Sequence, residues 1–172
     1  AVAKVVRDMG YSAKDFHPDN CIYVGGGLKR ALLPDDYQEF VHQTFNIPHN
    51  RDFQNYSMQE LNSGMPKCRE CGRYHVPPRI VPMILDKDGD NLLPYDLNGG
   101  EIEGRAAFFD LALDGRWGGI ITGDRISIDY APTGCSHPGP SIRNNIARYA
   151  DLEGDDKIGC AGTIDAYVRG VA

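Results

Sequence analysis

Residues 55–75 read Asn-Tyr-Ser-Met-Gln-Glu-Leu-Asn-Ser-Gly-Met-Pro-Lys-Cys-Arg-Glu-Cys-Gly-Arg-Tyr-His and combine two chemical features. An acidic turn ending at Glu60 suits a nucleotide and its magnesium ion. Directly after it, Cys68, Cys71 and His75 form a Cys-x-x-Cys-x-x-x-His pattern. This spacing is typical of metal ligands because a Cys-x-x-Cys turn presents two thiolates to one ion. The stretch therefore predicts a nucleotide site next to a metal site.

A later turn at residues 134–137, with the sequence Gly-Cys-Ser-His, can complete the metal site. A structural zinc ion takes four nitrogen or sulfur ligands in a tetrahedron. Residues 68–75 supply three of them, and Cys135 is the best fourth, with His137 as the alternative. The competing interpretation is free thiols in a turn plus a surface histidine. Because four protein ligands leave no open position, we expect the zinc ion to stabilise the fold without taking part in catalysis.

The composition is that of an ordinary globular protein. Of its 172 residues, 41% are hydrophobic and 24% are charged. This length is sufficient for one domain, which can have two lobes. The formal net charge of −6 argues against a nucleic-acid-binding surface. No apolar run approaches the roughly 18 residues that span a membrane. The first residues lack an initiator Met and a signal peptide and read as mid-helix, so we expect an excised internal fragment.

The cysteine content points to a reducing compartment. Five cysteines are an odd number, which fits poorly with a closed set of disulfides. We therefore expect a cytoplasmic protein whose thiols are reduced, some of them bound to metal. Cys21 and Cys160 lie within apolar runs, which predicts buried thiols.

Hydrophobic patterns predict a mixed α/β fold. We expect a helix within residues 1–14, where Gly10 is a stop signal, and a second helix over 34–45. We expect strands over residues 21–24, 52–56, 80–85, 101–111, 119–130 and 146–149, with a last strand within 156–168. The acidic turn at 86–90 lacks the terminal Glu of a calcium loop and is expected to close a hairpin. The prediction is a small sheet with helices over residues 1–60, an antiparallel β-rich part holding zinc over 61–154, and a hinge region over 155–172.

Two further motifs can contribute to the nucleotide site. Gly25, Gly26 and Gly27 follow the first expected strand, where glycine lets the backbone approach a ligand or adopt a positive φ. An ordinary strand-to-helix turn is the alternative, because the spacing matches neither a dinucleotide-binding nor a P-loop motif. Asp124, in a Thr-Gly-Asp sequence, offers a carboxylate that accepts hydrogen bonds. The structural alternative is an acidic residue in a hairpin without a ligand.

The order of these motifs resembles the adenylate-forming acid ligases, specifically the phenylacetate–CoA ligase branch and its acyl-protein synthetase-like relatives. The matching segments are the glycine turn at 24–29, the Tyr-x-x-x-Glu motif at 56–60, the Gly-x-x-His segment at 72–75, the Gly-Glu-Ile strand at 100–102, the Thr-Gly-Asp motif at 122–124, the cysteine turn at 133–137 and the Asp-Asp…Gly segment at 155–162. The resemblance covers nearly the whole chain from about residue 22. It rests on the order of these motifs along the chain and not on any single motif.

The resemblance implies a role for each matched position. Glu60 would help to hold the magnesium ion of ATP, and Tyr56 would lie against the adenine. Asp124 would accept hydrogen bonds from the ribose hydroxyls, and the glycines at 25–27 would line the adenine and acyl pocket. One of the aspartates at 155–156 would mark the hinge about which the family's small C-terminal domain rotates.

The implied reaction joins a carboxylic acid to ATP, giving acyl-AMP and pyrophosphate, and then transfers the acyl group to a thiol such as coenzyme A or a carrier protein, or to an amine. Because two anions must approach each other, cations and positioned donors provide most of the catalysis. The family's phosphate-binding loop and its C-terminal domain with the catalytic lysine match no segment of this chain. We therefore expect the fragment to be inactive alone.

The sequence also departs from the family pattern. The arginine that usually contacts the ribose is missing before residues 155–156, and Arg148 or Lys157 can replace it. Thr133 stands where the family has a cysteine, whereas Cys71 is an additional thiol, so four metal ligands are kept. The structural alternatives are a solvated turn for Glu60 and for residues 155–157. The functional alternative is a non-catalytic, zinc-stabilised binding or assembly module; a zinc-ribbon nucleic-acid binder fits the thiols but not the acidity.

Overall fold

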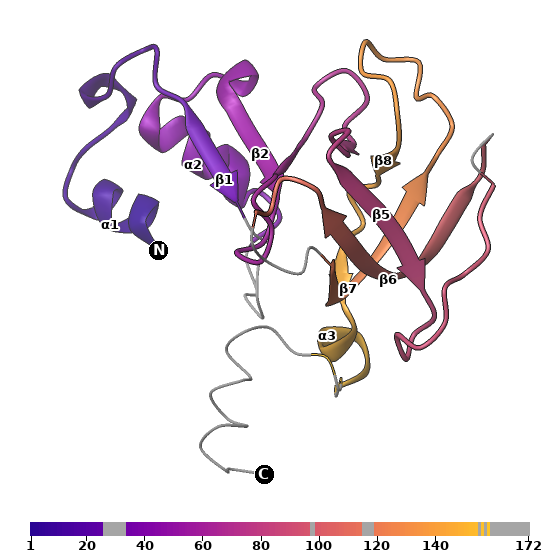
Figure 1. Cartoon of the computed structure of the whole chain (residues 1–172). Coiled ribbons are helices and arrows are strands. Elements are labelled where there is room, and N and C mark those ends of the chain that lie inside the picture. Colours follow the sequence, from indigo (N-terminus) through magenta and orange to yellow (C-terminus); the bar gives the residue numbers. More distant parts are fainter. Residues whose placement is uncertain (26–33, 97–98, 115–118, 155, 157, 159–172) are drawn as a thin grey trace. The chain divides into compact units, whose positions relative to one another are not determined.

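The computed structural model describes residues 1–25, 34–96, 99–114, 119–154, 156 and 158, which divide into two compact units (Figure 1). The first unit ends at Asn55 and the second begins at Tyr56, close to the expected boundary at residue 60. Gly26, Gly27 and almost all of the strand expected within residues 156–168 lie outside the described residues.

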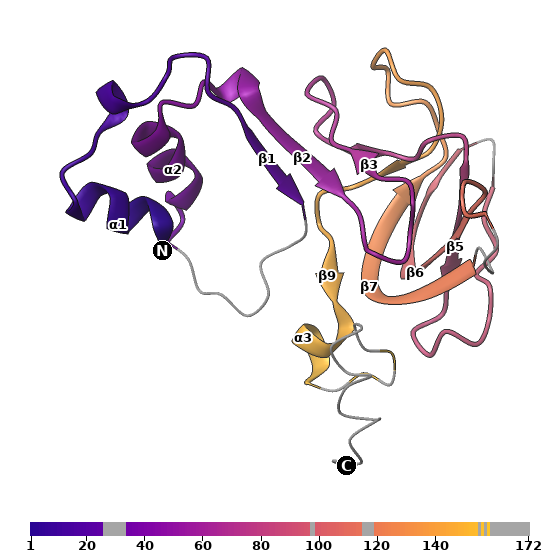
Figure 2. The same cartoon turned by 60° about the vertical axis from the view of Figure 1, so that its left-hand side comes forward.

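The first unit combines helices with a pair of parallel strands. Its elements are α1 (Val2–Asp8), the 3-10 helix η1 (Ala13–Asp15), β1 (Ile22–Gly25), α2 (Tyr37–Phe45), the 3-10 helix η2 (His49–Arg51) and β2 (Asp52–Tyr56), whose last residue begins the second unit. β1 and β2 pair with Ile22 opposite Asp52. α1 and α2 lie side by side (Figures 1 and 2), and Arg7 Nε donates to Thr44 Oγ1 over 3.1 Å. The predicted combination of a small sheet with helices is confirmed.

The first helix ends at Asp8, and Gly10 follows it with φ +87°, a left-handed conformation that stops an α-helix, in line with the predicted stop signal. One local prediction for this unit was wrong. Cys21 is exposed and not buried, because it precedes β1 and that strand itself is largely exposed on the unit's surface.

The second unit is an antiparallel β structure. Its elements are β3 (Met65–Pro66), β4 (Tyr74–His75), β5 (Ile80–Leu85), β6 (Glu101–Asp110), β7 (Gly119–Asp129), β8 (Ser141–Ile142), β9 (Ala147–Arg148) and α3 (Tyr149–Glu153). The order in the sheet is β4-β8-β7-β6-β5, and β9 adds to β7. β6 and β7 form the longest ladder, with a register shift between Arg105 and Ala107, and Figure 2 shows β7 curving along its length. The predicted antiparallel β-rich part is confirmed.

The core of this unit is apolar, and the sheet pattern explains it. β5 alternates along its length, with Ile80 and Ile84 buried and Val81 exposed, as expected for a strand with one face on a core. The largest fully buried apolar side chains come from several strands: Met65, Ile84, Phe108, Ile126, Ile128 and Ile142. Among the described residues, no helix has both the length and the apolar character that a membrane crossing requires.

Candidate functional site

A tight turn presents the first group of metal-ligand candidates. The backbone N–H of Gly72 donates to the Cys68 carbonyl over 2.9 Å, and the N–H of Cys68 donates to the Arg73 carbonyl over 2.8 Å. Gly72 has φ +69°, a conformation that glycine adopts without steric cost. The chain then enters β4, where His75 pairs with Ser141 of β8. Two-residue strands therefore fix the position of the histidine relative to the thiols.

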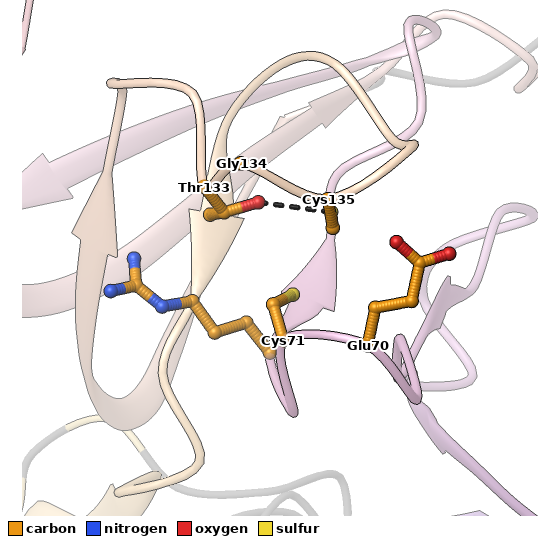
Figure 3. Close-up of a pocket in the computed structure, with 6 residues that line it drawn as sticks. Glu70, Cys71, Thr133, Gly134 and Cys135 are labelled. Carbon is orange, nitrogen blue, oxygen red and sulfur yellow. Dashed lines mark hydrogen bonds between the residues drawn. The ribbon is translucent and has the colours of Figure 1, made fainter.

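A second loop, residues 133–137, lies against this turn, and one carboxylate joins the two. Glu70 accepts hydrogen bonds from the backbone N–H of Ser136 over 3.0 Å and from its hydroxyl over 2.7 Å. These two bonds lower the pKa of Glu70 below its usual range. Figure 3 shows Glu70 and Cys71 on one side and Thr133, Gly134 and Cys135 on the other. The contact holds the two ligand-bearing loops together without metal.

The thiols and imidazoles approach one another at distances that suit a single ion. His75 Nε2 lies 3.3 Å from both Cys71 Sγ and Cys135 Sγ, and Cys68 Sγ lies 3.7 Å from His137 Nδ1. In a zinc tetrahedron, with Zn–S of about 2.3 Å and Zn–N of about 2.0 Å, sulfur and nitrogen ligands are separated by about 3.5 Å. The observed separations match the edges of such a tetrahedron.

Cys68, His75, Cys135 and His137 form a group that can hold a metal ion, since their ligand atoms all lie within 4.8 Å of one another. Cys71 is a fifth donor, because its thiol interacts with those of Cys68 and Cys135. The structure thus brings together every predicted ligand, including both candidates for the fourth position. Cys68 and His75 are buried, whereas His137 is exposed.

The electrostatics of the group favour metal-binding protonation states at two positions. The Thr133 hydroxyl, 3.0 Å from Cys135 Sγ, is the main cause that lowers the pKa of Cys135 to about 7. Burial, followed by the nearby His137 and Arg73, lowers the pKa of His75, so its imidazole is neutral. Burial raises the pKa of the Cys71 thiol. A thiolate and a neutral imidazole are the forms that coordinate a metal.

The thiols open onto a small polar depression. A cavity of about 340 Å³ is lined by Glu70, Cys71, Arg73, Thr133, Gly134 and Cys135 (Figure 3). His75 Nε2 is the ring nitrogen that faces the thiols. The other ring nitrogen, Nδ1, is buried, and no described residue forms a hydrogen bond with it.

Two of the predicted nucleotide residues, far apart in sequence, meet in the second unit. The Tyr56 hydroxyl donates to Asp124 Oδ2 over 2.8 Å, and Arg148 Nε lies 3.5 Å from Asp124 Oδ1. The Tyr56 ring is buried and packs edge-on against Phe108. Burial, and then the negative charge of Asp124, raises the pKa of Tyr56 well above its usual value. The tyrosine therefore acts here as a buried hydrogen-bond donor to the aspartate.

The remaining predicted nucleotide residues are not part of this contact. Glu60 is an exposed residue of the turn that follows Tyr56, and Gly25 ends β1 in the first unit. The loop after Glu60 is held by Asp110 of β6, whose carboxylate accepts the backbone N–H groups of Asn62 and Ser63. The roles predicted for Glu60 and the glycines stay predictions.

Asp156, which the resemblance places in the hinge and for which a solvated turn was the structural alternative, has its side chain buried in an ion pair. Its two carboxylate oxygens accept hydrogen bonds from Arg105 NH1 and NH2 over 2.9 and 2.7 Å, and both side chains are almost inaccessible. Arg105 also stacks on the ring of Tyr149, 4.5 Å from its centroid. The solvated-turn alternative was wrong for Asp156, because nothing near it in sequence reveals an arginine in β6. The hinge role stays a prediction.

Several contributors to these sites escaped the sequence analysis. Glu70 and Ser136 flank the ligands and have no motif of their own. A cluster of Glu39, His42 and His49 in the first unit was also missed. Glu39 and His42 are three residues apart on α2, the spacing that places two side chains on one helix face, and this was the available signal.

Comparison with known proteins leaves the chain without an assigned relative: no family model, no curated protein and no solved structure matches it.

Proposed function

We propose that this chain is the part of an adenylate-forming acid ligase that contacts the ribose of the nucleotide, and that a structural zinc ion stabilises it. The observation that carries the proposal is the contact between Tyr56 and Asp124, two motif residues 68 positions apart. Arg148, one of two candidates for the missing ribose-contacting arginine, lies beside the same carboxylate. Two residues that the resemblance assigns to the nucleotide, and one candidate replacement for the missing arginine, thus lie together.

In this proposal Asp124 accepts the ribose hydroxyls and Arg148 aids their binding. Tyr56 serves as a positioning residue, because its buried ring offers no free face to an adenine while its hydroxyl orients the carboxylate. In the complete enzyme the carboxylate would attack the α-phosphate of ATP, forming acyl-AMP and releasing pyrophosphate, and a thiol such as coenzyme A would then take the acyl group and release AMP. Glu60 would help to hold Mg²⁺. This chain's share is to bind and orient the nucleotide.

Isothermal titration calorimetry of the full chain with AMP tests the nucleotide proposal. We expect saturable binding that Asp124→Asn weakens by about 10-fold or more, since charged hydrogen bonds contribute about 1.5–3 kcal/mol each. Asp88→Asn is the matched control, because Asp88 is exposed in the turn after β5. Absence of AMP binding, or equal binding by Asp124→Asn, contradicts the ligase proposal.

The zinc component rests on the converging Cys and His side chains of the second unit and has a test of its own. We expect the chain purified without chelator to contain zinc bound by the cysteine group. We also expect Co²⁺ substitution to produce a thiolate charge-transfer band. Cys135→Ser should lower metal affinity at least about 10-fold, whereas Cys21→Ser, an exposed thiol of the first unit, should leave it unchanged. No bound metal and no charge-transfer band would refute a zinc centre.

A second function, a non-catalytic zinc-stabilised binding module, is favoured by the same converging thiols and histidines, which require no nucleotide. The two experiments separate the candidates. Zinc binding together with AMP binding supports the ligase, whereas zinc binding without AMP binding supports the module.

A further inference from the structure

The first unit contains a second cluster of metal-binding side chains, independent of the cysteines. Glu39 and His42 project from α2, and His49 lies in η2, after the turn that ends α2. Ligand atoms of these three residues lie within 4.8 Å of one another. The rings of His42 and His49 meet edge-on with their centroids 5.1 Å apart. The cluster is built from one helix and the segment that leads from it into β2.

A carboxylate lies behind each imidazole, within hydrogen-bond distance of His42 and in an exposed ion-pair contact with His49. His42 Nε2 lies 3.2 Å from Asp52 Oδ2, and His49 Nε2 lies 3.5 Å from Glu39 Oε2. A carboxylate only accepts hydrogen bonds, so each neutral imidazole satisfies its carboxylate by carrying its proton on Nε2. Both Nδ1 atoms then present lone pairs, and these two atoms lie 3.3 Å apart.

Two facing lone pairs at this distance repel each other unless a proton or a cation lies between them. Two nitrogen ligands of a tetrahedral zinc ion, at Zn–N distances of about 2.0 Å, are separated by about 3.3 Å. The separation of the two Nδ1 atoms therefore equals the edge that a zinc ion requires. A carboxylate behind a ligating imidazole is also the usual support of a metal-bound histidine.

A second observation points to positive charge at the same place. Asp52 Oδ1 is buried and accepts no hydrogen bond from any described residue, while Oδ2 accepts from His42 and from Gln54. A buried carboxylate oxygen without a hydrogen bond is costly, and a cation bound to His42 would reduce that cost electrostatically. His42 itself is only 8% exposed, so its orientation is held by packing.

We propose that His42 and His49 bind a divalent first-row transition metal ion such as Zn²⁺ through their Nδ1 atoms. Asp52 and Glu39 support the two imidazoles from behind. The site has two nitrogen ligands from the protein, and His49 and Glu39 are exposed, so water or a small ligand completes the coordination. Imidazole ligands select such metals over Mg²⁺ and Ca²⁺, which prefer oxygen. The site thus keeps free coordination positions, whereas the cysteine group offers enough protein donors to complete a tetrahedron.

Histidine-selective ¹⁵N NMR of the full chain during a Zn²⁺ titration tests this site residue by residue. The chain has five histidines. We expect the Nδ1 signals of His42 and His49 to move in a saturable manner while His17 stays unchanged. His75 and His137 report the cysteine group in the same spectra. A zinc response at His42 and His49 alone would thus refute the structural zinc centre and leave this proposal standing.

Variants and a second cation sharpen the test. His49→Ala should abolish the zinc response of His42, and this exposed position should tolerate the change, with His17→Ala as the matched control. Glu39→Gln should weaken zinc binding about 10- to 100-fold, the usual effect of losing a supporting carboxylate. The proposal is overturned if His42 and His49 do not respond to millimolar Zn²⁺, if His49→Ala leaves the response of His42 intact, or if Mg²⁺ produces the same response.

Discussion

Asp110 shows how a single buried carboxylate can organise a loop. Its side chain is only 1% exposed, yet it accepts hydrogen bonds from the backbone N–H groups of Asn62, Ser63 and Ala112 and from the Ser63 hydroxyl. Burial by itself raises the pKa of Asp110, but the hydrogen bonds from Ala112 and Ser63 outweigh it, and the pKa falls below its usual value. The ionised form is therefore the one that the fold stabilises.

Asp110→Asn should destabilise the second unit by about 2 kcal/mol at neutral pH, because the amide places an NH₂ group against N–H donors. A depressed folded-state pKa means that the carboxylate contributes stability above its unfolded pKa of about 3.9. That contribution is lost as the pH falls through the lower folded-state pKa. The difference between wild type and variant in urea unfolding should therefore shrink below about pH 4.

The exposed Asp88→Asn variant is the control for Asp110→Asn and should unfold like the wild type at every pH. A wild-type advantage that persists unchanged at acidic pH would show that ionisation of Asp110 is not the source of the stability.

The secondary-structure elements differ in how far local sequence explains them. β5 follows a period of two, with Ile80 and Ile84 inward, and was predicted with its bounds. β6 does not alternate, since residues 104–108 are all buried. Both faces of β6 are covered over this stretch, and Arg105 is buried against Asp156. A strand covered on both faces tolerates a charged residue only when that residue is paired.

The shortest elements carry the candidate metal ligands. β4 and β8 have two residues each, and their pairing places His75 opposite Ser141. Such short ladders contribute few hydrogen bonds, so they depend on side-chain ties such as Arg73, which donates to Asp129 over 3.0 Å and to Ser141 over 3.3 Å. No periodic pattern marks strands of this length, so the sequence does not predict them.

At the scale of the second unit, the ion pair of Arg105 and Asp156 joins segments 51 residues apart. Asp156→Ala should lower the free energy of unfolding by about 3–5 kcal/mol, because it leaves a buried guanidinium without its counter-ion. Chemical denaturation of the full chain measures this change. The double variant Arg105→Met/Asp156→Leu should lose less than the single variant, since no unpaired charge remains.

Asp19→Ala is the comparison for this pair, because the ion pair of Asp19 and Arg51 is exposed and should contribute only about 0–1 kcal/mol. Equal effects of Asp19→Ala and Asp156→Ala would show that burial does not strengthen the dependence on Asp156.

The sequence by itself determined the features that depend on neighbouring residues. Hydrophobic patterns located β5, β6 and β7, and the Cys-x-x-Cys spacing identified the candidate metal-binding turn. These signals are local, because strand geometry and turn geometry act over a few residues.

Only the tertiary structure decided which distant side chains meet. It brought Cys135 and His137 to the same turn, placed Tyr56 against Asp124, and buried Asp156 on Arg105. It also turned the imidazoles of His42 and His49 toward each other. Each of these contacts depends on the path of the chain between its partners. Strand pairing and helix packing set that path, and no pattern of adjacent residues encodes it.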